Sequence, residues 1–178
     1  MSKVSHAIAA SAALSLGLLT TTSAFAGGDG APQNHFFAGA NGVALAVFEI
    51  GGPTASAFGG GAFFEFTAIE NWLEIEASFH YLRAHGANEL PIDVLLKKPF
   101  HVNNWFHPYV GLGGVAVPVL ATDTAPLAFH GGVAAVGGAY FWFSQHVGWS
   151  AEINDNVLFG GGHVLNEVGG TSGIVFGW

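Results

Sequence analysis

The chain has 178 residues, of which 51% are hydrophobic, only 9% are charged, and 27 are glycines. A soluble domain usually carries about a quarter of charged residues, so this composition suits a protein whose outside is lipid rather than water. The formal net charge of −8 argues against a nucleic-acid partner, because phosphate binding needs a basic surface.

The N-terminal segment, residues 1–26, is predicted to be a cleaved secretory signal peptide. Lys3 supplies a short positive region, an uncharged apolar stretch follows, and residues 24–26 form a small-x-small cleavage site. We expect residues 27–33 to be a flexible start of the mature chain and residues 34–178 to be one domain. The sequence has no cysteine, which argues against disulfides and a lipoprotein anchor.

The apolar stretches of the mature chain are poor helices. Residues 126–143 contain two pairs of adjacent glycines, and residues 106–120 contain two prolines. Strands of 9–12 residues fit the length better, since a membrane is crossed only by helices or by a closed barrel. The predicted fold class is therefore all-β, an eight-stranded antiparallel up-and-down transmembrane β-barrel. Its expected strands are residues 34–47, 57–68, 73–83, 90–102, 108–120, 127–143, 148–159 and 168–178.

The connections between these strands alternate in length. Short turns are expected at residues 69–72, 103–107 and 144–147, and longer or glycine-rich loops at residues 48–56, 84–89, 121–126 and 160–167. Short turns of outer-membrane barrels lie in the periplasm, so an even strand count predicts that both termini are periplasmic.

The five tryptophans fall near the predicted short turns or at the C-terminus. This clustering predicts an aromatic girdle at one membrane interface. The girdle residues are Trp72, Trp105, Trp142, Trp149 and Trp178.

Alternation of apolar and polar residues is clearest in the third, fourth and seventh expected strands. A one-residue slip would move their carboxylates into lipid, so the facing of these strands is well determined. Facing of the first, fifth and sixth strands, which are rich in Gly, Ala and Val, stays open. The predicted polar lumen network consists of Glu65, Glu74, Glu76, His80, Asp93, Lys97, Glu152, Asn154 and Asn156.

Two charged residues break the alternation. Lys98 is expected near the rim, where its long side chain can reach the headgroups. Asp155 is expected to mark either a β-bulge or a shorter membrane band.

Three segments resemble the small outer-membrane β-barrel superfamily, the broad group that includes the OmpA barrel domain and the OmpX-like and OmpW-like proteins. They are residues 90–100 (LPIDVLLKKPF), residues 107–114 (HPYVGLGG) and the terminal FGW of residues 176–178. The resemblance implies a location in a Gram-negative outer membrane, contact with its lipids and lipopolysaccharide, and recognition of the C-terminal strand by the barrel-assembly machinery.

The predicted function is non-enzymatic, namely a structural or surface-interaction barrel whose lumen is filled by side chains. One alternative is a narrow pore or carrier for small or hydrophobic solutes, for which Pro118 could open a gap in the wall. Another is a lipid A-modifying enzyme, since Ser78 and His80 share one face with Glu76. The His-x-Ser element of barrel deacylases is missing, however, which weakens that hypothesis.

No cofactor and no metal site are predicted. The mature chain has eight histidines, but none forms a His-x-His or His-Glu-x-x-His motif. The glycine runs at residues 59–61 and 160–162 are not phosphate loops, because neither is followed by Lys-Ser/Thr.

Overall fold

The computed structural model describes residues 35–49, 55–84, 87–122 and 126–178, so the predicted signal peptide and the segment 27–33 lie outside the described residues. The described chain is built of strands and turns. The strands are β1 (Phe36–Glu49), β2 (Ala55–Ile69), β3 (Leu73–Ala84), β4 (Ala87–Glu89), β5 (Ile92–Pro99), β6 (Phe106–Leu120), β7 (Ala128–Trp142), β8 (Val147–Gly160) and β9 (His163–Gly177). No helix among these residues is long and apolar enough to cross a membrane.

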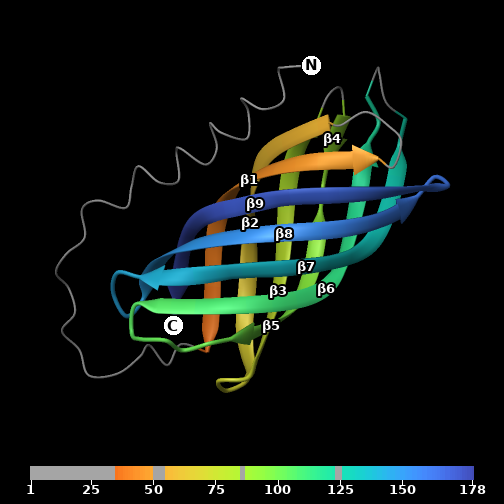
Figure 1. The fold of residues 1–178 in the computed structure, drawn as a ribbon. Helices are drawn as coiled ribbons and strands as arrows, with labels where there is room; N and C mark the ends of the chain where they lie inside the picture. Colours follow the sequence, from red (N-terminus) through yellow and green to blue (C-terminus); the bar gives the residue numbers. More distant parts are fainter. Residues whose placement is uncertain (1–34, 50–54, 85–86, 123–125) are drawn as a thin grey trace, which may run out of the picture.

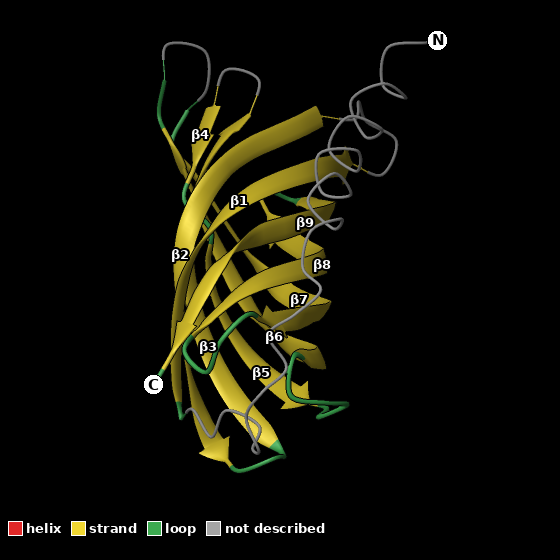
Figure 2. Cartoon of the chain, turned by 90° about the vertical axis from the view of Figure 1, so that its left-hand side faces the viewer, coloured by secondary structure: helices red, strands yellow, loops and turns green. Residues whose placement is uncertain are grey.

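The strands form one closed antiparallel sheet. Apart from β4 and β5, each strand pairs with its neighbours in the chain, and β1 pairs with β9, which closes the barrel. β4 and β5 are two parts of one wall strand, because both pair with β3 and β6 in an unbroken register on either side of Leu90 and Pro91. Figure 2 shows the resulting strands wrapped around a common interior. The predicted eight-stranded antiparallel barrel is therefore confirmed.

The two ends of the barrel differ. The end that we call the turn end carries the short turns 70–72, 100–105 and 143–146. The C-terminus lies there too (Figure 1), since the Trp178 carbonyl accepts hydrogen bonds from His35 N and Phe36 N at 3.1 and 3.2 Å. The opposite end, which we call the loop end, includes the hairpin between β8 and β9.

Two predicted loops are shorter in the structure. Residues 87–89 of the expected loop 84–89 form β4, and Ala84 pairs with Ala87. The connection between β8 and β9 differs more. A loop was expected over residues 160–167, but β9 already begins at His163, which pairs with Gly160. Gly161 and Gly162 form the two-residue turn with φ of 58° and 81°. This is the left-handed backbone that a type I′ hairpin needs and that glycine adopts at low cost. A glycine run suggests a long loop, whereas here it makes a tight turn.

The structure shows which face of the glycine- and alanine-rich strands points into the barrel. The buried side chains include Phe37 and Val43 in β1, Tyr109 and Val117 in β6, and Tyr140 in β7. Inside the barrel, large side chains pack closely against some glycines because these glycines have no side chain. A Cβ atom added to Gly39 would overlap the Phe63 ring, so this aromatic ring fits inside only because its neighbour is glycine.

The interior is layered along the barrel axis. Near the loop end, Val43, Leu45, Ala57 and Leu82 form an apolar cluster, and the larger cluster that includes Val117 and Leu158 reaches the same end. At the turn end, Phe37 stacks near Tyr140 and Trp142, with ring centroids 6.0 and 5.8 Å apart. Between these apolar layers lies a polar centre.

Candidate functional site: the polar centre of the lumen

The polar centre is organised around one buried ammonium group. Lys97 projects inward from β5 and is only 1% exposed. Its Nζ lies 2.5 Å from Glu76 Oε2, and 3.3 Å from both Glu65 Oε2 and Glu152 Oε2. Three carboxylates from β3, β2 and β8 therefore converge on one cation, which ties distant strands together across the lumen.

Two tyrosines complete this group. The Tyr140 hydroxyl donates a hydrogen bond to Glu65 Oε2 at 2.8 Å, and the Tyr109 hydroxyl donates to Glu152 Oε2 at 3.0 Å. The Lys97 ammonium also lies 4.2 Å from the centroid of the Tyr109 ring, a cation–π contact. Sequence reasoning missed both tyrosines, because β6 and β7 carry no charges that would reveal which face points inward.

A second polar group lies beside β3, toward the loop end. The Ser78 hydroxyl donates to Asp93 Oδ2 at 3.0 Å, and His80 Nδ1 lies 3.6 Å from the same oxygen. His80 Nε2 is 3.2 Å from Asn41 Oδ1, so Asn41 of β1 belongs to this group although the sequence did not single it out. The Ser78 hydroxyl points to a carboxylate and not to an imidazole base, which is the wrong arrangement for an activated serine.

The remaining predicted lumen residues lie on β8 and at the edge of the first group. Asn156 is buried and donates to Glu167 Oε2 at 3.4 Å, and Glu167 of β9 is a further buried carboxylate that was not predicted. Asn154 Oδ1 and Glu74 Oε2 are buried without a hydrogen-bond partner. All nine predicted lumen residues thus lie on the inward-facing positions of their strands. They belong to the group around Lys97, to the group around His80, or to the set on β8.

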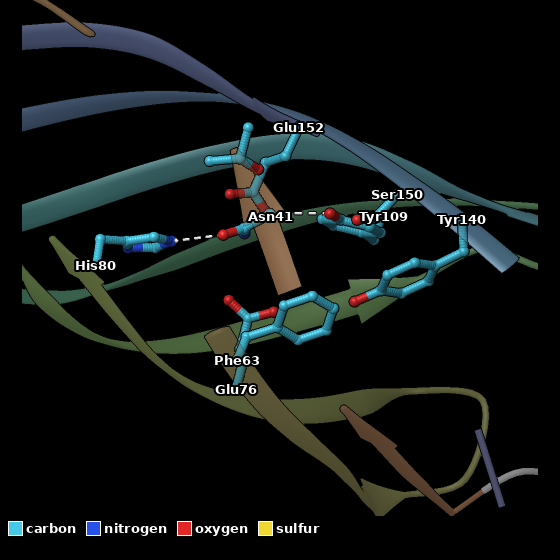
Figure 3. A pocket seen from close by; sticks show the side chains of 9 residues that line it. Asn41, Phe63, Glu76, His80, Tyr109, Tyr140, Ser150 and Glu152 are labelled. Atoms are coloured by element: carbon cyan, nitrogen blue, oxygen red, sulfur yellow. Dashed lines mark hydrogen bonds between the residues drawn. The ribbon is translucent and has the colours of Figure 1, made fainter. Parts of the chain in front are cut away.

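The polar centre contains a small cavity of about 10 Å³, lined among others by Asn41, Glu76, His80, Tyr109 and Ser150. Figure 3 shows these side chains converging from several strands. A cavity of this size accepts about one water molecule, given its polar lining. Side chains from several strands therefore occupy most of the space around this cavity.

The wall next to the prolines is continuous. The Leu90 N–H donates to the Pro118 carbonyl at 2.9 Å, and the His80 N–H donates to the Pro91 carbonyl at 2.9 Å. The neighbouring pairs Glu89–Val119 and Ile92–Ala116 keep one register. Pro118 removes a donor from the ladder but does not part the strands, so the gap that the carrier alternative would need is not observed beside Pro118.

The tryptophans divide into two sets. Trp72, Trp105 and Trp178 are more than half exposed at the turn end, and Trp149 points outward, with its indole N–H donating to Ser172 Oγ at 2.9 Å. Trp142 differs from the prediction, because it is only 6% exposed and lies inside the barrel. Its partner across the ladder is Gly148, which leaves room for the indole.

The two charged residues that break the alternation both point outward. Lys98 Nζ donates to the Asn71 carbonyl at 2.7 Å, at the turn-end rim. Asp155 pairs in regular register with Ala135 and Val168, so the expected β-bulge is not present. Its carboxylate accepts a hydrogen bond from Asn166 Nδ2 at 2.6 Å on the outer wall.

Comparison with known proteins agrees with this fold. Neisserial surface protein A matches with a TM-score of 0.70 at 12% identity, over 80% of this chain and 97% of that chain. OprG from Pseudomonas aeruginosa matches with a TM-score of 0.60 at 16% identity, over 83% and 98%. Ail, the attachment invasion locus protein of Yersinia pestis, matches with a TM-score of 0.56 at 14% identity, over 81% and 100%.

Neither a protein-family profile nor a curated protein sequence matches the chain. The similarity to solved structures therefore rests on the arrangement of strands. The chain has the fold of the small eight-stranded outer-membrane barrels.

Proposed function

We propose that the chain is a compact outer-membrane barrel with a non-enzymatic, structural or surface-interaction role, and that its lumen is closed to solutes. The observation that carries this proposal is the filled centre of the lumen. Lys97, its three carboxylates and two tyrosines occupy the middle of the barrel, and apolar side chains pack toward both ends. An eight-stranded barrel is just wide enough for side chains to fill it.

The outer surface supports the proposed location. Large apolar side chains are exposed on the outward positions of the strands, including Phe79, Leu96 and Leu112. Such a surface is costly in water and favourable in lipid. The partners that we propose are therefore outer-membrane lipids and lipopolysaccharide, with the barrel-assembly machinery recognising β9 and its terminal Trp178.

The proposed orientation places the turn end and both termini in the periplasm. Exposed tryptophans at that end fit a membrane interface. The surface role is supported by analogy, since one protein of the same fold is named a surface protein and another an attachment invasion protein.

Conductance in planar bilayers tests the closed lumen. The purified, refolded barrel is expected to give no steps above background, and the variant in which both Lys97 and Tyr109 are replaced by Ala is expected to raise leakage. Steady conductance by the unmodified protein would contradict the proposal and favour a pore.

Lipid A from cells that overproduce the protein tests the non-enzymatic assignment. We expect an unchanged mass spectrum, because the Ser78 hydroxyl is bonded to Asp93 inside the barrel. A new lipid A species that disappears in the Ser78→Ala variant would establish an enzyme instead.

A further inference from the structure

Two histidines at the turn end lie side by side. His107 is near the start of β6 and faces inward, and His101 is in the turn that precedes β6. Their ring centroids are 4.7 Å apart and the ring planes are inclined by 58°. His101 is exposed, whereas His107 is only 7% exposed and also makes an edge-on contact with the Trp142 ring.

The His107 ring carries an unsatisfied nitrogen. His107 Nε2 is buried and has no hydrogen-bond partner. Burying such a group costs free energy unless something binds it. Two other described histidines differ, because His80 lies against Asn41 and Asp93 and His146 Nδ1 lies 2.9 Å from the Gly177 carbonyl.

The turn that carries His101 is held in place by its own hydrogen bonds. Asn103 Oδ1 accepts hydrogen bonds from the backbone N–H groups of Trp105 and Phe106, at 3.0 and 2.8 Å. The Phe100 N–H donates to the Pro108 carbonyl at 2.8 Å on the other side of His101. The two imidazoles are therefore brought together by a structured turn.

We propose that His101 and His107 form a binding site for one divalent transition-metal cation of the Zn²⁺ or Cu²⁺ type, at the turn-end mouth of the barrel. Two imidazoles bound at neighbouring positions of one metal, with metal–nitrogen bonds of about 2.1 Å, have ring centroids roughly 4.6–5.3 Å apart. The observed separation of 4.7 Å falls in this range. Neutral imidazole suits these metals, whereas Ca²⁺ and Mg²⁺ prefer oxygen ligands.

The site supplies two protein ligands and leaves the remaining positions to water. No group of three or more His, Asp or Glu side chains within the described segments is placed to hold a metal ion. Binding is therefore reversible, and its consequence is local, since the ion ties the turn 100–105 to the first residues of β6. Any ligand that binds only the folded state also raises the stability of that state.

Calorimetric titration of the tag-free, refolded barrel with Zn²⁺ alone, repeated with Cu²⁺ alone, tests the site. One equivalent should bind with higher affinity than the rest, and His101→Ala should weaken that step at least tenfold. His101 is exposed, so this variant should fold, which heat-modifiability on a denaturing gel checks.

The matched control is His146→Ala, which removes an exposed histidine from a neighbouring turn of the same end and should leave the affinity unchanged. His107→Gln should abolish the tight step as well. Equal weakening by the His101 and His146 variants, or wild-type affinity in His101→Ala, would show adventitious surface binding and overturn the proposal.

Discussion

At the scale of single residues, the stability of the lumen depends on the charge balance around Lys97. One ammonium faces Glu65, Glu76 and Glu152 within 3.3 Å, and the chain offers few other cations, since it has only four Lys and Arg residues in all. Each buried charge loses its hydration, so the group is stable only while every member keeps its partner. Lys97 is the member that all three carboxylates share.

Replacing Lys97 by Met should therefore lower the free energy of unfolding by about 3–5 kcal/mol, because it leaves buried carboxylates without their cation. Urea unfolding of the barrel in lipid bilayers, followed by tryptophan fluorescence, measures this loss. Lys98→Met is the matched control, since Lys98 is on the outer wall with a single bond to the Asn71 carbonyl. It should change stability by less than about 1 kcal/mol. Equal effects in the two variants would contradict the role of Lys97.

Asp155 is a carboxylate on the outer wall, with Ile153 and Val157 as its outward neighbours on β8. A charge on the lipid face costs free energy in proportion to its depth. We expect Asp155→Leu to raise the unfolding free energy in bilayers by about 1 kcal/mol. Ile153→Leu, at an outward position that is 69% exposed, should be neutral. A loss of stability in Asp155→Leu would show instead that the bond to Asn166 outweighs the cost of the charge.

At the scale of elements, the hairpin between β8 and β9 depends on its two glycines. Gly162 has a φ of 81°, and nothing lies within 4 Å of an added Cβ atom, so a substitution there tests backbone conformation alone. Gly162→Ala should cost about 1–2 kcal/mol of unfolding free energy. Gly137→Ala is the control, because its added Cβ atom also meets nothing, and Gly137 is not among the residues with positive φ. Similar losses in both variants would mean that strand propensity, not the turn, is responsible.

The same elements show why the sequence predicts some strands better than others. In β3, β5 and β8, polar and apolar residues largely alternate, apart from Lys98 and Asp155, so residues such as Glu76, Lys97 and Glu152 reveal the inward face. In β6 and β7 both faces are apolar, so alternation along the strand does not distinguish the inward face from the outward face. Tyr109, Tyr140 and Trp142 were therefore not recognised as lumen residues, although they line or border the polar centre.

Strand pairing also brings together residues that the sequence pattern within one strand cannot connect. Asp93 lies beside Ser78 because β3 and β5 pair with that register, and Tyr140 reaches Glu65 from a strand 75 positions away in the sequence. Spacing along one strand placed Ser78, His80 and Glu76 on one face, which suggested a catalytic group. In the structure, Ser78 instead donates a hydrogen bond to Asp93 on the neighbouring strand β5. The spacing of residues within β3 could not predict this contact.

At the scale of the whole molecule, the even number of wall strands places both ends of the barrel domain on one side of the membrane. The absence of cysteine in the sequence makes this orientation testable with single cysteines. Ala121 is exposed just after β6 at the loop end, and Glu70 is exposed in the turn between β2 and β3 at the turn end. These two positions report on opposite faces of the membrane.

A membrane-impermeant maleimide applied to intact cells should label Ala121→Cys, because the loop end is proposed to face the outside. Glu70→Cys should be labelled only after the outer membrane is permeabilised, since the turn end is proposed to face the periplasm. Each variant is the control for the other, because both side chains are exposed and differ mainly in the end that carries them. Labelling of Glu70→Cys in intact cells, with Ala121→Cys protected, would reverse the orientation and with it the periplasmic position of the His101–His107 site.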